Sequence, residues 1–149
     1  MHTMSTYKLV YFPVRGRGES IRLLLKDNKI DYEEENCRDG WVEKYKPQMP
    51  LGQVPLLCDG DYKLSQSCAI LRYLARKHDL YGSDVKEQGL MDMICDGSED
   101  LRSKYQTMIY TNYENGKQPY IAKLPAELEK FEKLLSKNNG GQTYMVGDK

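Results

Sequence analysis

The chain has 149 residues, enough for one ordinary domain or two small ones, and its 40% hydrophobic and 30% charged residues are typical of a globular protein. Its 22 basic and 22 acidic residues give a formal net charge of +0, so no bulk field draws it to nucleic acid or to an anionic membrane. No apolar run approaches the ~20 residues of a membrane helix. The first residues lack the layout of a signal peptide. We therefore expect a cytoplasmic protein with reduced thiols.

The cysteines and histidines do not indicate a metal site or a nucleophilic triad. The spacing of the cysteines is typical of neither a zinc site nor a Cys-x-x-Cys redox pair. They are Cys37, Cys58, Cys68 and Cys95. The two histidines, His2 and His78, are too few for a histidine-based metal site. We therefore predict no bound metal.

The first elements place a tyrosine hydroxyl at the end of a strand. Aromatic and branched residues predict a strand at Tyr7–Tyr11, and Pro13 and Gly16 interrupt it. Helical spacing of apolar residues predicts a helix over 18–28, followed by a strand over 31–36. Ligands of α/β sheets bind at the carboxyl ends of strands, near helix N-termini. A phenol at Tyr11 could donate a hydrogen bond to an anion there.

The next residues predict a β-hairpin followed by a helix. The segment 40–52 contains Trp41 and two prolines, so we expect an irregular stretch with at most a short helix. A strand over 53–58 precedes the Asp59-Gly60-Asp61 turn, and residues 62–64 return antiparallel. Gln66 and Ser67 then open a helix with an apolar face.

Pro55 lies inside the predicted third strand and has two interpretations. It is either a proline on an edge strand, or it follows a cis Val54–Pro55 bond that turns the backbone of Val54 toward a ligand.

The second half predicts two long helices after a linker near residues 79–84. An apolar stripe runs through about Tyr113, Asn115-Gly116 breaks the helix, and Pro119 suits the first turn of the next helix. That helix, with a possible kink at Pro125, ends near Gly140-Gly141. We assign residues 5–79 to an α/β domain and 85–149 to a partial all-α domain. Two such helices cannot bury both stripes, so this domain is expected to be unfinished.

Several motifs together are similar to those of the cytosolic glutathione transferases, most like the pi class. They are Tyr11-Phe12-Pro13-Val14-Arg15-Gly16-Arg17, Gly52-Gln53-Val54-Pro55, Asp59-Gly60-Asp61, Gln66-Ser67, Leu80-Tyr81-Gly82 and Asp100-Leu101-Arg102. The resemblance implies an α/β plus all-α fold: an N-terminal thioredoxin-like domain (β-α-β-α-β-β-α) and the first part of an all-helical domain, truncated at the C-terminus relative to the family. It also implies conjugation of the glutathione thiolate to hydrophobic electrophiles, in detoxification. Glutathione would be a co-substrate, and no cofactor is expected.

The resemblance assigns a role to individual residues. Tyr11 would be the catalytic hydroxyl, since a hydrogen bond donated to a thiolate favours the ionised form; the alternative is a packed strand-end tyrosine. Glutathione would be held by Tyr11, Phe12, Arg17, Trp41, Lys46, Gln53, Val54, Pro55, Gln66, Ser67 and Asp100. The electrophile would contact Phe12, Val14 and Tyr110. Asp100 would reach the glutathione of a neighbouring subunit, which implies a homodimer.

Each of these roles has a plainer alternative. Gln66 and Ser67 could simply cap their helix, Lys46 could be a solvated lysine, Val14 could be a core residue, and Asp100 could be a surface carboxylate. Leu51 stands where the class has an aromatic residue that locks its dimer, which weakens the expected association.

The sequence therefore leaves three hypotheses. The chain is an active glutathione transferase; or, with an incomplete helical domain, it only binds glutathione, hydrophobic ligands or a protein; or it does not fold stably.

Overall fold

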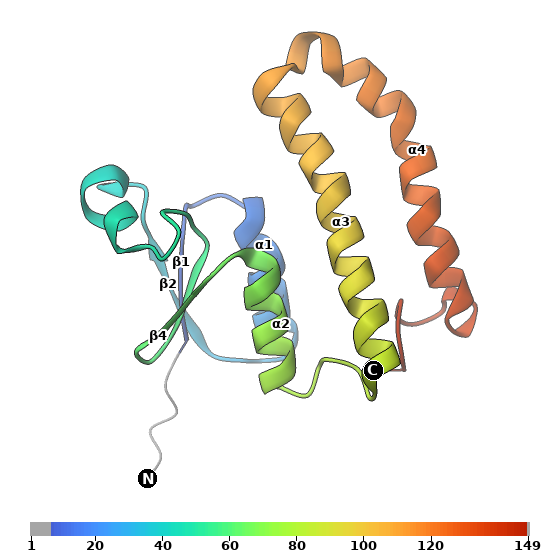
Figure 1. The fold of residues 1–149 in the computed structure, drawn as a ribbon, viewed down its shortest axis with the longest axis horizontal. Coiled ribbons are helices and arrows are strands. Elements are labelled where there is room, and N and C mark those ends of the chain that lie inside the picture. The colour runs from blue at the N-terminus through green and yellow to red at the C-terminus, as the bar shows by residue number, and fades with distance from the viewer. Residues whose placement is uncertain (1–6, 149) are drawn as a thin grey trace. The chain divides into compact units, whose positions relative to one another are not determined.

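The computed structural model describes residues 7–148, so His2 lies outside the described residues. The chain divides into two compact units, with the division between Lys77 and His78 (Figure 1). The sequence places this division slightly later, within residues 79–85. Each unit is described by itself below.

The first unit is a four-stranded mixed sheet with two α-helices. Its elements are β1 (Tyr7–Tyr11), α1 (Glu19–Asp27), β2 (Tyr32–Asn36), β3 (Leu56–Asp59), β4 (Tyr62–Ser65) and α2 (Ser67–Lys77). The strand order is β2-β1-β3-β4. β1 is parallel to β2 and antiparallel to β3, and β3 is antiparallel to β4. This confirms the thioredoxin-like fold predicted from the sequence.

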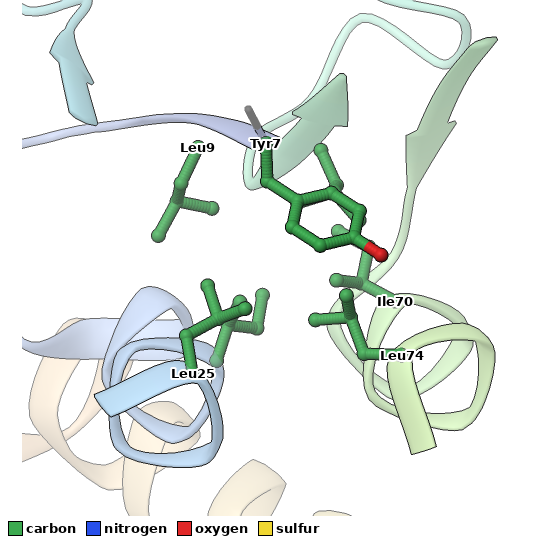
Figure 2. Close-up of a cluster of buried hydrophobic side chains, with 7 residues drawn as sticks. Tyr7, Leu9, Leu25, Ile70 and Leu74 are labelled. Atoms are coloured by element: carbon green, nitrogen blue, oxygen red, sulfur yellow. The ribbon is translucent and has the colours of Figure 1, made fainter. Parts of the chain in front are cut away.

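The core of this unit lies between one face of the sheet and the two helices. Leu9, Leu25, Ile70 and Leu74 are fully buried, and Tyr7 joins them. Figure 2 shows side chains from the sheet, α1 and α2 pointing toward one another in this layer. The alternation of β1 places Tyr7 and Leu9 on the helix-covered face. Apolar spacing of three and four on each helix completes the layer.

Residues between β2 and β3 cover the opposite face of the sheet. Cys37, Tyr45 and Met49 pack there against Val10 and Leu56. The segment contains only a π-helical turn at Trp41–Tyr45 and a 3₁₀ turn at Lys46–Gln48. The second helix of the predicted order is thus reduced to these two turns, as the irregular composition indicated, because Gly40 is left-handed and prolines at 47 and 50 limit helical hydrogen bonding.

The structure confirms the turn of the predicted hairpin but corrects the start of its first strand. The turn is confirmed, since Asp59 pairs with Tyr62 around Gly60, whose φ is 59°. The start of the third strand is corrected from Gln53 to Leu56. Pro55 has no N–H to donate to a neighbouring strand, so regular pairing begins only after it.

The second unit consists mainly of α3 (Val85–Thr111) and α4 (Tyr113–Lys137), which run antiparallel (Figure 1). The Asp84 carboxylate caps α3, accepting hydrogen bonds from the backbone N–H groups of Lys86 and Glu87 at 2.8 and 3.0 Å. Such a cap satisfies two N–H groups that have no partner within the helix.

The predicted break between the long helices is wrong by three residues. Asn112, with φ −155° and ψ 46°, separates them, whereas Asn115 and Gly116 lie inside α4. The Gly116 N–H already donates to the Asn112 carbonyl at 2.7 Å, forming the first turn. Gly116 also sits where a Cβ would be 3.2 Å from the Met108 side chain. Close approach, rather than a turn, explains this glycine.

The predicted first-turn position of Pro119 is wrong as a consequence. Pro119 and Pro125 both lie inside α4, where each lacks the N–H of a regular helical bond. Figure 1 shows α4 bending in its N-terminal half, the distortion expected of internal prolines.

The long helices are far less buried than α1 and α2. Only Met108 is buried on α3, and no α4 residue is. The row of apolar residues predicted along α3 is only partly buried, since Leu90 and Tyr105 are 46% and 47% exposed. Across residues 7–148, none of the helices has both the length and the apolar character needed to cross a bilayer.

Candidate functional site

The register of the sheet gathers the predicted site residues of the first unit at one edge. Val10 pairs with Leu56, which in turn pairs with Ser65. These three residues therefore form a row across β1, β3 and β4. Tyr11 follows the row at the end of β1, Val54 and Pro55 come just before β3 begins, and Gln66 and Ser67 come just after β4 ends. Segments distant in sequence thus emerge side by side.

The Tyr11 hydroxyl is held by the turn that follows it. Tyr11 is 7% exposed, and its hydroxyl oxygen accepts a hydrogen bond from the Arg17 backbone N–H at 2.8 Å. A Cβ on Gly16 would lie 2.4 Å from the Tyr11 oxygen, and one on Gly18 would lie 2.5 Å from the ring. Both glycines are therefore needed for the turn to close over the phenol. The backbone bond leaves the O–H of Tyr11 as a donor for a ligand.

Aromatic side chains continue from Tyr11 along this edge. The rings of Tyr11 and Phe12 have centroids 5.8 Å apart, and Phe12 meets Trp41 edge-on at 5.3 Å. Val54 packs against the same cluster as Phe12 and Trp41. Phe12 and Trp41 are only partly buried, so they offer apolar surface beside the Tyr11 phenol.

The N-terminus of α2 supplies the polar groups of the site. Gln66 has a φ of +73°, a left-handed conformation that is uncommon for residues other than glycine and that gathers at functional sites. Its amide donates to the Gln53 side-chain oxygen at 3.0 Å. Ser67 is the first residue of α2 and is buried. A helix N-terminus with a hydroxyl and free N–H groups favours an anion.

Three further predictions can be compared with the first unit directly. The Val54–Pro55 peptide bond is cis, as the second interpretation of Pro55 predicts. Val14 is 45% exposed, which excludes its alternative as a core residue. Lys46 is exposed on its 3₁₀ turn.

Asp100 and Tyr110 belong to the second unit. Both lie on α3, where Asp100 is exposed and Tyr110 is 80% exposed. Their roles toward glutathione and the electrophile stay predictions.

Two of the described cysteines are poorly suited to act as nucleophiles. All four are free thiols. Burial raises the pKa of the Cys37 and Cys58 thiols above the ordinary value, which disfavours the nucleophilic thiolate.

Sequence reasoning missed three contacts around the site. The Arg17 backbone N–H donates to the Tyr11 hydroxyl; the side chains of Gln53 and Gln66 are hydrogen-bonded to each other; and the Arg22 guanidinium donates to the Phe12 carbonyl. Only the Gly16 and Gly18 spacing hinted at a close approach of backbone to the phenol. The other contacts join residues with no pattern between them.

The fold and this edge define a thioredoxin-like unit with an anion-favouring, aromatic-lined site, followed by a helical unit. The family model "Glutathione S-transferase, N-terminal domain" matches residues 7–76, and "Glutathione S-transferase, C-terminal domain" matches residues 99–149. The human protein "Glutathione S-transferase P" is 50% identical over 147 residues, which cover 97% of this chain and 70% of the human protein. The Xenopus laevis protein "Glutathione S-transferase P 1" is 47% identical over 150 residues, covering 98% and 71%.

A solved structure agrees with these sequence matches. The Onchocerca volvulus pi-class glutathione S-transferase superposes with a TM-score of 0.92 at 46% identity, covering 97% of this chain and 70% of that one. The chain therefore belongs to the glutathione S-transferase family, and its relatives here are of the pi class. It is a member of a family of transferases.

Proposed function

We propose that this chain conjugates the thiol of glutathione to hydrophobic electrophiles, with Tyr11 as the catalytic hydroxyl. The observation that carries the proposal is the Tyr11 phenol, held at the sheet edge by the Arg17 backbone N–H with its own proton left to donate. Family membership supports the choice of glutathione as the substrate.

The proposed chemistry depends on ionising the sulfur. A free thiol has a pKa of about 8.5, so only a few per cent is thiolate at pH 7. A hydrogen bond from the Tyr11 O–H stabilises the anion. A shift of about two pKa units corresponds to roughly 2.7 kcal/mol and makes the thiolate dominant near neutrality. The thiol proton goes to solvent, the sulfur forms a bond to the electrophilic carbon, and the leaving group departs with its electron pair.

The remaining residues would bind the two substrates. Ser67 and Gln66, at the N-terminus of α2, suit the γ-glutamyl carboxylate, with Gln53 beside them and Arg17 adding positive charge. Val54 would pair through its backbone with the cysteinyl unit, next to Pro55. Trp41 and Lys46 would contact the glycyl end. The electrophile would lie against Phe12, Val14 and Tyr110. Asp100 would act across a homodimer, and we place the reaction in cytoplasmic detoxification.

Tyr11→Phe tests the proposal, and Tyr7→Phe is its matched control. Both changes remove a hydroxyl from the same face of β1, but Tyr7 lies in the apolar core. With chlorodinitrobenzene as the electrophile, we expect Tyr11→Phe to lose about 10- to 100-fold in kcat near pH 6.5. Retention on glutathione-agarose should persist in both variants. Equal turnover in the Tyr11→Phe variant and the parent would exclude Tyr11 as the thiol activator.

The same experiment addresses the binding-module hypothesis. If the parent chain is retained by glutathione-agarose but shows no turnover above the uncatalysed reaction, the chain binds glutathione without conjugating it.

A further inference from the structure

The guanidinium of Arg22 is the most heavily hydrogen-bonded side chain near the site. Arg22 lies on α1, and its side chain is only 13% exposed. It donates to the Glu34 carboxylate from Nε at 2.9 Å and from Nη2 at 2.5 Å, and to Glu19 from Nη1 at 2.9 Å. The Glu34 hydrogen bond is the main reason why the pKa of Arg22 is raised. The Arg22 guanidinium is therefore charged, and its hydrogen bonds fix its orientation.

The same guanidinium holds the backbone that follows Tyr11. Nη1 donates to the Val14 carbonyl at 2.9 Å, and Nη2 donates to the Phe12 carbonyl at 3.3 Å. Its central carbon is 5.7 Å from the centroid of the Tyr11 ring. An ion pair that merely joined α1 to β2 would need none of these three contacts.

These contacts connect Arg22 to the position of the phenol. The turn that begins at Phe12 leads directly to Gly16 and Arg17, which close over the Tyr11 oxygen. If the Phe12 and Val14 carbonyls move, the Arg17 N–H moves with them. The direction in which the Tyr11 O–H can donate would then change.

We propose that Arg22 is a positioning residue: it fixes the turn after Tyr11 and so aims the phenol at the glutathione sulfur. This role rests on the proposed function of Tyr11. Lysine cannot replace the arginine, because an ammonium group is a single point charge and cannot bridge the Glu34 carboxylate and the two carbonyls at once.

Arg22→Lys in the full 149-residue chain is the test, with Arg38→Lys as the matched control at an exposed position. The first readout is the ultraviolet thiolate absorbance of bound glutathione against pH. We expect the apparent pKa of the bound thiol to rise by about half to one unit in Arg22→Lys. kcat/KM should fall about two- to fivefold near pH 6.5 and recover above pH 8.5, where the free thiol ionises unaided.

A merely structural role predicts a different result. It would lower the melting temperature and the active fraction but leave the pH profile of the folded protein unmoved, and this outcome would overturn the proposal. If Arg22→Lys does not fold, Arg22→Ala is measured with millimolar ethylguanidinium. Return of the thiolate absorbance supports the positioning role, and no return on folded protein contradicts it.

Tyr11→Phe is measured alongside to separate the two proposals. If Tyr11→Phe raises the thiol pKa and Arg22→Lys does not, only the role of Arg22 is wrong. If Tyr11→Phe leaves the thiol pKa unchanged, the role of Tyr11 fails, and that of Arg22 fails with it.

Discussion

The α/β unit and the helical unit bury their helices to very different extents. In the first, Ile21, Leu25, Ile70 and Leu74 on two short helices are completely buried. In the second, 27- and 25-residue helices contain one buried residue, Met108. Most helical stability in proteins comes from packing of an apolar face rather than from length. We therefore expect the long helices to be the less stable part of this chain, in spite of their length.

The contacts between elements differ in kind as well. In the first unit an apolar layer joins the helices to the sheet. In the second, α3 and α4 are also joined by an ion pair between Lys104 and Glu127 at 2.8 Å. Exposed ion pairs contribute at most about 1 kcal/mol, whereas a fully buried leucine contributes several times more.

The largest expected difference comes from the same substitution in each unit. Leu74→Ala removes a side chain with no exposed surface from α2, and Leu128→Ala removes one that is 49% exposed from α4. We expect Leu74→Ala to lower the free energy of unfolding by about 2–5 kcal/mol, and Leu128→Ala by less than about 1 kcal/mol. Urea titrations followed by Trp41 fluorescence and by circular dichroism measure both. Equal losses would show that the helical unit is as well packed as the first.

Glycine substitutions should change stability in opposite directions. A Cβ on Gly18 would lie 2.5 Å from the Tyr11 ring, whereas one on Gly89, inside α3, has no atom within 4 Å. Gly18→Ala should therefore cost about 1–3 kcal/mol. Gly89→Ala should stabilise by roughly 0.5–1 kcal/mol through lower backbone entropy in the unfolded chain. Thermal melts of the two variants report the sign. A neutral Gly18→Ala would mean that the turn over Tyr11 is loosely held.

A smaller effect is expected at the best-buried polar contact of the helical unit. Tyr81 is 6% exposed, and its hydroxyl donates to Asp92 on α3. Tyr81→Phe should cost about 1 kcal/mol, the net value of a typical hydrogen bond. Chemical denaturation measures the loss, and Tyr144→Phe, on a 53% exposed tyrosine, is the control. A loss as small as that of the control would mean that the bond contributes nothing.

The smallest expected effect is the pH dependence of the stability contributed by the Lys104–Glu127 ion pair, which joins the long helices. Hydrogen bonds from Lys104 and then Lys130 lower the pKa of Glu127 to about 2. Because the folded-state pKa is lowered, the ionised Glu127 stabilises the folded protein above the unfolded value of about 4.3. That contribution is lost as the pH falls from there toward 2. Melting temperatures across this range should converge for the parent and Glu127→Gln at low pH. Parallel curves would contradict the ion pair.

Local patterns allowed much of the first unit to be predicted. The hairpin at Asp59-Gly60-Asp61, the strand ending at Tyr11 and the cis Val54–Pro55 bond depend on a few adjacent residues. The motifs shared with the family supplied the predicted site residues. The break at Asn112 was missed because Asn115-Gly116 has the stronger turn composition. In the structure, however, Gly116 approaches Met108 inside α4, a contact that composition does not reveal.

The sequence alone determines three features: the succession of strands and helices along the chain, the tyrosine at the end of a strand, and the family that the chain resembles. The first two features depend on near neighbours along the chain, through turn chemistry and apolar periodicity, whereas the resemblance depends on short motifs such as Tyr11–Arg17 and Gly52–Pro55. Only the tertiary structure shows that Arg17 donates its backbone N–H to Tyr11 and that Arg22 holds the Phe12 carbonyl. Such contacts depend on how the turn folds back on the strand. The spacing of Gly16 and Gly18 permits a close approach to the phenol, but it does not identify the groups that meet there.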